Sequence, residues 1–317
     1  MKILLLNYEF PPMGGGASNA TCNIAKEFVQ MGHTVHVLTS KLKEQLKEEE
    51  MHGITVYRVP SWRKGIHDCG MRGAYTYIFF ALFKLTYLLK YNDYDIAHVF
   101  FSLPTGLLTL LPGKIRTIPY IVSLRGSDVP GYDPYNKKLQ FFHKLLKPLT
   151  RLIWKRSKGV VALSDGLKTT ALETNPEQDI AVIGNGVETE LFKPVDKRSD
   201  DMMFKLICVT RLIERKGVQH ILEALKEIND PAIRLQVVGT GSYEKNLKLM
   251  TYYFKLSHQV DFYGYSKREE LPGFYGRNDC FILPSMAESF GIVFAEAMAC
   301  ELPIIAGRTG GVPDLIK

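Results

Sequence analysis

Four charged side chains in the second half of the chain have the types and spacing to bind a phosphorylated sugar. Arg211 and Lys216 follow a run that reads as a strand, residues 205–209. A guanidinium offers a planar fork to phosphate oxygens, and an ammonium adds a compact second charge. Glu288 and Glu296 flank the start of a predicted helix, and a carboxylate accepts hydrogen bonds from the paired hydroxyls of ribose and hexose rings. The alternatives are a solvated turn for the cations and a surface or capping pair for the glutamates.

Two segments predict helix N-termini at which a phosphate group can bind. The first is the run P-P-M-G-G-G-A-S, residues 11–18, between the first strand and the first helix. Glycines let a backbone approach a ligand, and the helix that follows offers unpaired N–H groups. The run is neither a G-x-G-x-x-G fingerprint nor a P-loop, and a tight turn without a ligand is the alternative. The second segment is 291–293, which opens a helix in the same way.

Short apolar runs alternate with helical patterns along the chain, and this alternation predicts parallel sheets covered by helices on both faces. No hairpin signals are evident. The expected strands are residues 3–6, 34–38, 54–59, 96–100, 120–123, 160–163, 205–209, 235–238, 260–262, 281–283 and 303–306. The expected helices include residues 18–31, 214–228, 243–256 and 292–299.

The pattern divides the chain into two Rossmann-like α/β domains, residues 1–190 and 191–317. The charged segment 187–201, which carries Pro194, is the expected hinge. Ligands of such sheets bind beyond the carboxyl ends of the strands. We therefore expect the two sheets to face one another across a cleft that holds the ligand.

The motifs and their order resemble glycosyltransferase family 4, whose members are retaining enzymes with the two-domain GT-B fold. The resemblance extends over nearly the whole chain. It is carried by four ordered segments: Pro11-Pro12 with Gly15-Gly16 and the later Gly32-His33-Thr34-Val35, the R-L-x-x-x-K-G run from Arg211 to Gly217, the E-x7-E pair Glu288 and Glu296, and the loop Gly310-Gly311-Val312-Pro313-Asp314.

The resemblance implies a role for each matching residue. Glu296 would contact the ribose of a nucleotide-sugar donor, and Glu288 would contact the transferred sugar. The diphosphate would be contacted by Gly16, Arg211 and Lys216. The rest of the implied donor site is Gly15, Phe290, Gly291, Ile292 and Val293. Glu288, Arg211 and Lys216 are the implied catalytic residues, and the family works without a metal and without a cofactor other than its donor substrate.

The predicted acceptor site differs from the common family pattern. After the strand 120–123 this chain has Arg125-Gly126-Ser127-Asp128, where many members have His-Gly. We expect Arg125 and Asp128 to bind the acceptor. Arg125 either holds an anionic acceptor or pairs with Asp128 in a structural role. The run Asp93-Tyr94-Asp95 has the form of a metal-binding D-x-D motif, but it precedes a strand and is interpreted as a strand-entry turn.

Composition indicates a folded protein of a reducing compartment. Hydrophobic residues make up 46% of the 317 residues and charged residues 23%, a composition that argues against disorder. The 5 cysteines are dispersed, which predicts free thiols rather than a disulfide or zinc framework. The start of the chain reads as a strand and not as a signal peptide. We expect a cytoplasmic protein.

A basic segment suggests a place at the inner face of the cell membrane. The net charge is +7, and residues 134–164 contain no Asp or Glu. Apolar residues from Phe141 to Trp154 are spaced for one face of a helix, with basic residues opposite. A helix lying on an anionic bilayer and a core helix with a solvated basic face fit this pattern equally. Nucleic acid fits it less well, because no known binding module accompanies the segment. A second apolar stretch, 74–89, predicts a buried or interfacial helix.

These observations predict a retaining, metal-independent glycosyltransferase. It would move a hexose-type sugar from a UDP- or GDP-sugar to a glycan or lipid-linked acceptor in cell-surface polysaccharide synthesis. The chain ends a turn into a new helix, so we expect a second domain that lacks its closing elements. Two alternatives stay open: a truncated, non-catalytic fragment that binds nucleotide sugar, and a nucleotide-sugar epimerase on the same fold.

Overall fold

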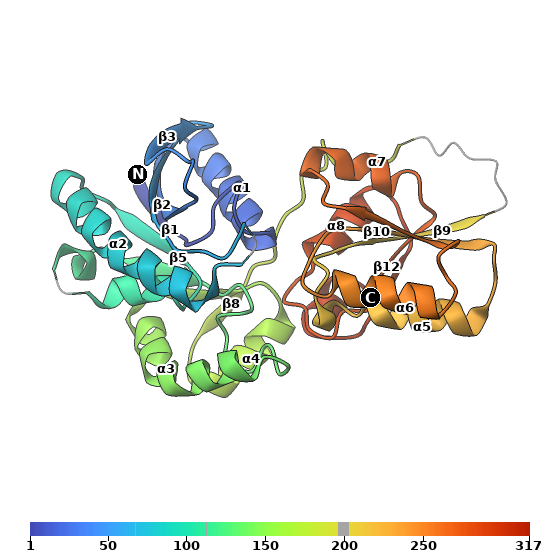
Figure 1. Cartoon of the computed structure of the whole chain (residues 1–317). Helices are drawn as coiled ribbons and strands as arrows, with labels where there is room; N and C mark the ends of the chain where they lie inside the picture. The colour runs from blue at the N-terminus through green and yellow to red at the C-terminus, as the bar shows by residue number, and fades with distance from the viewer. Residues whose placement is uncertain (67, 112, 196–202) are drawn as a thin grey trace. The chain divides into compact units, whose positions relative to one another are not determined.

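The computed structural model describes residues 1–66, 68–111, 113–195 and 203–317. The chain forms two compact units, Met1–Gly184 and Asn185–Lys317, and each is described by itself (Figure 1). The segment 187–201, expected as a hinge, belongs to the second unit as far as residue 195, and its remainder lies outside the described residues.

The first unit is built on an eight-stranded sheet with the order β3-β4-β2-β1-β5-β6-β7-β8. All neighbouring strands are parallel except β3 and β4. The strands are β1 (Lys2–Leu6), β2 (Thr34–Lys41), β3 (Glu48–Met51), β4 (Ile54–Pro60), β5 (Ile96–Phe100), β6 (Tyr120–Ser123), β7 (Gly159–Ala162) and β8 (Ile180–Val182).

The antiparallel pair of β3 and β4 corrects the expectation of parallel strands without a hairpin. His52 and Gly53 connect the two strands, and their φ angles of 53° and 75° are both positive. Two such residues form the tight turn whose twist suits a two-residue hairpin. The sequence signal is weak because His-Gly is not a typical turn pair and because β3, with the sequence E-E-E-M, is charged. Charged residues on an edge strand discourage pairing with other chains.

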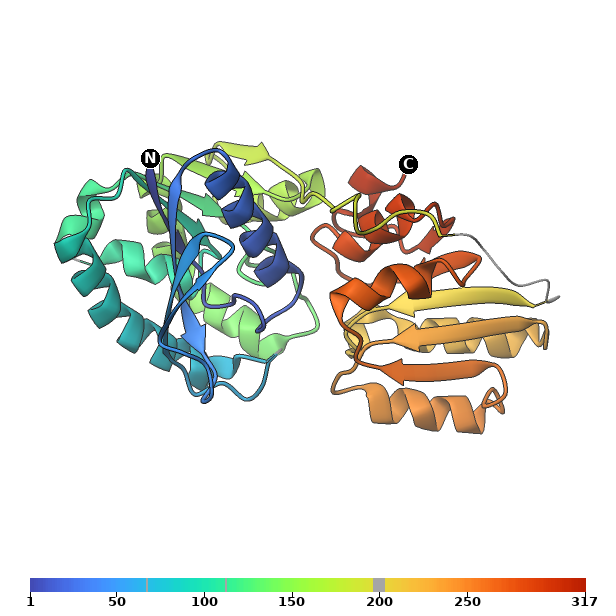
Figure 2. The ribbon, with the colours of Figure 1, turned by 90° about the horizontal axis from the view of Figure 1, so that it is seen from above.

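Helices cover both faces of this sheet. They are α1 (Gly16–Gln30), α2 (Gly70–Tyr91), α3 (Lys137–Arg156) and α4 (Asp165–Thr174), with the short 3₁₀ helices η1 (Thr105–Leu110) and η2 (Lys114–Thr117). Figures 1 and 2 show α1 and α2 on opposite faces of the strands. The parallel strands are buried, and four of their side chains are 0% exposed: Leu4, Leu5, Val37 and Val99. This burial explains their unbroken apolar runs.

The helix α3 does not have the single apolar face that the sequence predicts. Ile153 and Trp154 are fully buried, whereas Phe141, Leu145 and Leu149 are exposed. The helix therefore presents apolar side chains both to the core and to solvent. It begins at Asn136, whose side-chain oxygen accepts a hydrogen bond from the Leu139 amide, as a helix cap does.

The second unit has a five-stranded parallel sheet with the order β11-β10-β9-β12-β13. Its strands are β9 (Phe204–Val209), β10 (Ile233–Val238), β11 (Val260–Gly264), β12 (Cys280–Leu283) and β13 (Ile304–Ala306). Its helices are α5 (Val218–Ile228), α6 (Glu244–Tyr253), α7 (Leu271–Tyr275), α8 (Ile292–Ala299) and α9 (Val312–Leu315), with the 3₁₀ helices η3 (Glu214–Lys216) and η4 (Arg268–Glu270). Figure 1 shows α5 and α6 on one face and α7 and α8 on the other.

Both units are doubly wound α/β sheets, as the sequence predicts. In each sheet the strand order reverses beside the first strand, between β1 and β5 in one unit and between β9 and β12 in the other. Ligands of such folds bind at this switch point, beyond the carboxyl ends of the strands. Within the described residues, no helix is both long and apolar enough to cross a membrane.

Candidate functional site

The switch point of the second unit brings together three of the residues predicted from the sequence. Arg211 and Lys216 lie in the connection after β9, and Glu288 lies in the loop after β12. The two strands are hydrogen-bonded neighbours, with Ile207 opposite Phe281. Because both strands run parallel, their carboxyl ends meet at one edge of the sheet.

The connections after β9 and β12 touch one another through their backbones. Gly217 has φ +75°, and a Cβ atom there would lie 2.1 Å from the Pro284 carbonyl oxygen. The Met286 amide donates a hydrogen bond to the Arg215 carbonyl at 2.8 Å. Only glycine permits the contact at position 217, since any side chain would displace the Pro284 backbone. This contact fixes Lys216 beside the loop that carries Glu288.

Lys216 and Glu288 form a buried ion pair. The Lys216 Nζ donates a hydrogen bond to the Glu288 Oε2. The two residues are 9% and 8% exposed. Burial lowers the pKa of Lys216, Glu288 raises it, and the positive charges of Arg215 and Arg211 lower it further. Two further cations thus lie close enough to Lys216 to affect its charge, and three cations near one paired carboxylate are an excess of positive charge that suits an anionic ligand.

The loop after β13 holds the backbone of Glu288 in place. The Gly311 amide donates to the Glu288 carbonyl at 2.9 Å, and the Thr309 Oγ1 donates to the Met286 carbonyl at 3.1 Å. Gly310 has φ +52°, and a Cβ atom there would lie 2.0 Å from the Glu288 carbonyl oxygen. The G-G-V-P-D segment identified in the sequence therefore holds the backbone of Glu288 in position through contacts with its carbonyl group.

The helix α8 begins at the predicted place, directly after Glu288 and Phe290. Gly291 precedes it in the left-handed conformation, with φ +81°. Ile292 and Val293 are its first residues, and N–H groups of a first helical turn have no partner within the helix. Phe290 is 8% exposed, so its ring is buried and does not project into solvent. The arrangement suits an oxyanion close to the helix start.

Glu296 lies further along α8, inside a network of polar side chains. The Tyr275 hydroxyl donates to its Oε2 at 3.2 Å, and the Arg268 Nε lies 3.7 Å from its Oε1. Arg268 also pairs with the Glu188 Oε2 at 2.5 Å. Burial raises the pKa of Glu296 to about 7, against the opposing effect of Arg268. Ribose hydroxyls that bind Glu296 would have to share its carboxylate with Tyr275 and Arg268 or displace them.

The sequence did not indicate Arg268, Tyr275 or Glu188 as parts of the site. Arg268 lies in the run K-R-E-E, residues 267–270, which has the composition of a solvated turn. Its guanidinium nevertheless packs over the Phe192 ring, 5.0 Å from the ring centroid. A basic residue in a polar turn was the one available signal, and it is too common to identify a site.

In the first unit, the glycine-rich loop connects β1 to α1. Gly15 precedes α1, with open space where a Cβ atom would be, and Gly16 is the first helical residue. The conformational need for glycine falls on Gly14, which has φ +91° and whose Cβ atom would lie 2.8 Å from the Glu9 Oε2. Its amide donates to the Ile66 carbonyl at 2.9 Å. Contacts of Gly14 with Glu9 and Ile66 thus hold the loop in place, whereas open space adjoins Gly15 at the start of α1.

Arg125 and Asp128 follow β6 and are both buried. The Asp128 Oδ1 accepts from the Arg125 amide at 2.8 Å and from the Gly126 amide at 3.1 Å, and its Oδ2 accepts from the Ser102 amide at 2.7 Å. Burial raises the pKa of Asp128, against those hydrogen bonds. Its carboxylate therefore ties the exit of β6 to the exit of β5. The Arg125 guanidinium lies 5.4 Å from the Phe100 ring centroid, and burial lowers its pKa to about 10.

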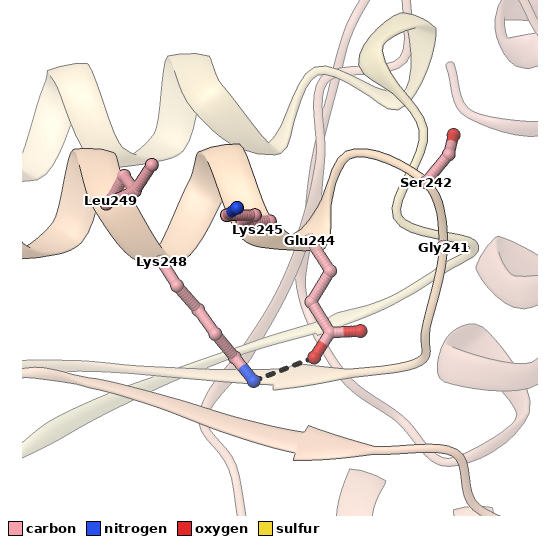
Figure 3. Close-up of a pocket in the computed structure, with 6 residues that line it drawn as sticks. All are labelled: Gly241, Ser242, Glu244, Lys245, Lys248 and Leu249. Atoms are coloured by element: carbon pink, nitrogen blue, oxygen red, sulfur yellow. Dashed lines mark ion pairs between the residues drawn. The ribbon is translucent and has the colours of Figure 1, made fainter.

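An open pocket adjoins the same edge of the second sheet (Figure 3). It is lined by Gly241, Ser242, Glu244, Lys245, Lys248 and Leu249, from the loop after β10 and the first turns of α6. Figure 3 shows Glu244 and Lys248 turned toward one another, and their charged groups pair at 2.7 Å. The loop also contacts the Arg211 connection, since a Cβ atom at Gly241 would lie 2.2 Å from the Leu212 carbonyl oxygen.

Potential metal ligands are scattered. Over residues 1–66, 68–111, 113–195 and 203–317, no group of three or more His, Cys, Asp or Glu side chains is arranged to hold a metal ion. Asp95, from the D-x-D run, accepts a hydrogen bond from the Lys2 amide at 2.6 Å at the entry to the sheet.

Family models match almost the whole chain. The model described as Glycosyltransferase Family 4 matches residues 14–191, and the one described as Glycosyl transferases group 1 matches residues 187–317. The chain belongs to glycosyltransferase family 4. It is therefore a glycosyltransferase, and the resemblance seen in the motifs is confirmed.

Relatives and solved structures agree with this membership. The family 4 chain is 25% identical to the GDP-mannose-dependent alpha-(1-6)-phosphatidylinositol monomannoside mannosyltransferase of Mycolicibacterium smegmatis, with 99% of this chain and 82% of the relative covered. It superposes on sucrose-phosphate synthase from Thermosynechococcus elongatus with a TM-score of 0.85 at 19% identity, covering 100% of this chain and 83% of the other. For Anabaena HepE in complex with UDP and glucose, the TM-score is 0.74 at 21% identity, with coverage of 100% and 83%. The family 4 chain thus has the GT-B fold, as the sequence predicts.

Proposed function

We propose that this family 4 glycosyltransferase moves a hexose-type sugar from a UDP- or GDP-sugar to a glycan or lipid-linked acceptor, with retention of anomeric configuration and without a metal ion. The observation that carries the proposal is the Lys216–Glu288 pair at the switch point, with Arg211 beside it. This pair supports the proposal because cations suited to phosphate and a carboxylate suited to hydroxyls lie at the edge where such sheets bind ligands.

The departing diphosphate is the group that most needs stabilisation in this reaction. Arg211 and Lys216 would neutralise its developing charge, as preorganised cations do in phosphate-transfer sites. The amides at the start of α8, from Gly291 to Val293, would donate hydrogen bonds to one of its oxygens. In the first unit, the start of α1 at Gly15 and Gly16 would offer amides in the same way.

The two glutamates would hold the two sugars of the donor. Glu288 would accept hydrogen bonds from hydroxyls of the transferred hexose, and Glu296 from the ribose hydroxyls. Glu288, Arg211 and Lys216 are the proposed catalytic residues. A covalent retaining mechanism needs a carboxylate nucleophile close to the anomeric carbon. We propose instead attack on the same face through an ion-pair-like transition state, in which the cations hold the leaving group.

The acceptor would bind in the first unit. Arg125 is the proposed contact to an anionic acceptor, and Asp128, whose carboxylate holds backbone amides, would position it. A lipid-linked acceptor for cell-surface polysaccharide agrees with the name of the mycobacterial relative, which includes a phosphatidylinositol acceptor. The exposed Phe141 and Leu145 on the basic helix α3 support contact with an anionic membrane. The five cysteines are thiols and not disulfides, which suits a reducing compartment, and we propose the inner, cytoplasmic face.

Calorimetric titration of the chain with UDP, GDP and their sugar conjugates tests the proposal. We expect binding of one nucleotide family, lost in Glu296→Ala and retained in Glu227→Ala, an exposed glutamate on α5. Arg125→Ala should retain donor binding and lose transfer to the acceptor. A folded chain that binds none of these nucleotides would refute the donor site. Release of an altered sugar nucleotide without any acceptor would identify an epimerase instead.

A further inference from the structure

The helix α2 carries a row of aromatic side chains on its outer face. Tyr75, Phe79, Phe83 and Tyr87 are 61%, 56%, 59% and 55% exposed. Met71 and Tyr91 continue the row at either end. Figures 1 and 2 show α2 along the outer side of its unit. Such a face is normally charged or polar in a helix that faces water.

The row forms a continuous face and not a scatter of single residues. Residues four apart lie about 40° apart around an α-helix, so the four central side chains fall within an arc of about 120°. The Phe79 and Phe83 ring centroids are 5.2 Å apart. The opposite side of α2 is already used, because Tyr77, Ala81 and Leu85 are buried against the sheet. The aromatic row is therefore not needed for the core of the unit.

Charge restricts what can cover this face. The 22 residues of α2 include Arg72, Lys84 and Lys90 but no Asp or Glu. The helix α3, which also lacks acidic residues, packs like α2 against η1. One carboxylate lies beside α2, since the Glu48 Oε2 of β3 is 3.9 Å from the Lys84 Nζ. The basic residues of the two helices outnumber it, and a surface with aromatic and basic side chains complements anionic lipid headgroups, where Tyr and Trp rings locate preferentially.

We propose that the outer face of α2 docks on an anionic lipid bilayer, with its aromatic rings at headgroup depth and the basic residues of α2 and α3 against the lipid phosphates. This surface deepens the proposed function, since it would bring the enzyme to a lipid-linked acceptor. It extends the contact proposed for α3, because α2 adds a longer row of aromatic side chains to the exposed Phe141 and Leu145 of α3.

Trp62 reports on the docking without any label. The chain has 2 tryptophans. Trp62 is 60% exposed and lies next to α2, with the Arg72 guanidinium 5.2 Å from its ring centroid, whereas Trp154 is fully buried. Vesicles of phosphatidylcholine with phosphatidylglycerol should shift the Trp62 emission to shorter wavelength. Trp62→Phe should abolish the shift, because Trp154 already lies in an apolar environment.

Sedimentation with the same vesicles tests the aromatic row directly. Phe79→Ser/Phe83→Ser should weaken vesicle binding by about 100-fold, since each inserted ring contributes about tenfold. The control is Tyr252→Ser/Tyr253→Ser, which removes an even more exposed aromatic pair from α6 in the second unit. Arg72→Gln/Lys90→Gln should weaken binding to anionic vesicles only. Circular dichroism should show that every variant is folded.

Unchanged vesicle binding of the Phe79→Ser/Phe83→Ser variant would overturn the proposal. So would a wild-type dimer that this variant converts to a monomer in light scattering, because the face would then be an interface between copies of the chain. Nucleotide-sugar binding by each variant, measured by calorimetry, separates the two ideas. A wild-type chain that binds no nucleotide sugar would refute the proposed function. A Phe79→Ser/Phe83→Ser variant that binds nucleotide sugar but not vesicles would support the docking face independently of the donor site.

Discussion

The ammonium of Lys216 and the carboxylate of Glu288 join the connections that follow β9 and β12, the two strands between which the strand order of the second sheet reverses. They are 72 residues apart in the chain. Each is the other's partner in the absence of substrate. The pair therefore serves the stability of the unit and also keeps two substrate-binding groups in place.

Removal of one member of this pair should cost more stability than removal of both. Lys216→Met leaves the Glu288 carboxylate buried without its cation, and we expect it to lower the free energy of unfolding by about 3 kcal/mol. Lys216→Met/Glu288→Leu should recover most of that loss but bind no donor. Urea unfolding and calorimetry measure the two effects.

The exposed pair Lys248 and Glu244 on α6 is the matched control. Lys248→Met should change the free energy of unfolding by only about 0.5 kcal/mol, because water solvates the carboxylate that remains. If the Lys216→Met/Glu288→Leu double variant is no more stable than Lys216→Met, the unpaired Glu288 carboxylate is not the cause of the lower free energy of unfolding in Lys216→Met.

The stability of the second unit should depend on pH through Glu296. Its folded pKa of about 7 lies above the ordinary 4.5, so the folded state prefers the neutral carboxyl. That contribution is complete below pH 4.5 and is lost as the pH rises through about 7. Relative to Glu296→Gln, the wild-type free energy of unfolding should fall by about 3 kcal/mol over this range. Urea unfolding of both proteins at a series of pH values measures the difference, and a constant difference would contradict the prediction.

Arg268 should set the pH at which Glu296 becomes able to bind ribose hydroxyls. The groups that face Glu296 are Arg268, Tyr275, Glu188 and Cys300, and Arg268 is the one whose charge lowers its pKa. Arg268→Gln should move the midpoint of donor affinity to higher pH, and Arg268→Lys should move it less. A nucleotide sugar is the suitable probe, because its diphosphate does not titrate near neutrality.

The exposed Arg277, at the end of α7, provides the control for this experiment. Arg277→Gln should leave the midpoint where it is in the wild type. A uniformly weaker affinity of Arg268→Gln, with the same midpoint, would show that Arg268 only supports the fold around α7 and α8.

Asp128 should matter for the first unit and not for donor binding. The Asp128 carboxylate accepts hydrogen bonds from three backbone N–H groups. In Asp128→Asn the side-chain NH₂ group, itself a donor, would face at least one of these N–H groups. We expect a loss of about 2–3 kcal/mol in the free energy of unfolding. Donor affinity should stay within about twofold of the wild type, less than 1 kcal/mol. Asp179→Asn, at an exposed aspartate, is the control, and an equal change in both variants would refute the role of Asp128.

The sequence predicted most of the fold because the buried parallel strands are unbroken apolar runs. Residues 96–100, 120–123 and 292–299 have the predicted bounds in the structure. The strand β3 was missed because its charges conceal it, and β8 because it has only three residues and only Ile180 is buried. For helices, spacing shows that apolar residues are present but not which of them the core uses. This is why the exposed row on α2 and the outward side chains of α3 required the structure.

The candidate site was predictable as separate residues but not as a set of contacts. Glu288 and Lys216 were expected to bind different parts of a donor, and nothing in their local sequence indicates that they pair. Arg268 has neighbours typical of a solvated turn, and its contact with Glu296 depends on how η4 packs against α8. Residue type and local spacing thus identified the chemistry, whereas long-range packing determined the partners.

The close backbone contacts at the edge of the second sheet limit how this enzyme can be redesigned. At Gly217, Gly241 and Gly310 an added Cβ atom would lie 2.1, 2.2 and 2.0 Å from a carbonyl oxygen of a neighbouring loop. Side-chain libraries aimed at a new donor should leave these three positions unvaried, because any residue other than glycine separates the loops. Gly264, at the end of β11, has open space around it, but its φ of +77° also favours glycine. Directed evolution of donor preference should therefore vary the exposed Tyr263 and Tyr265 on either side of it, while the loops after β9 and β12 stay unchanged.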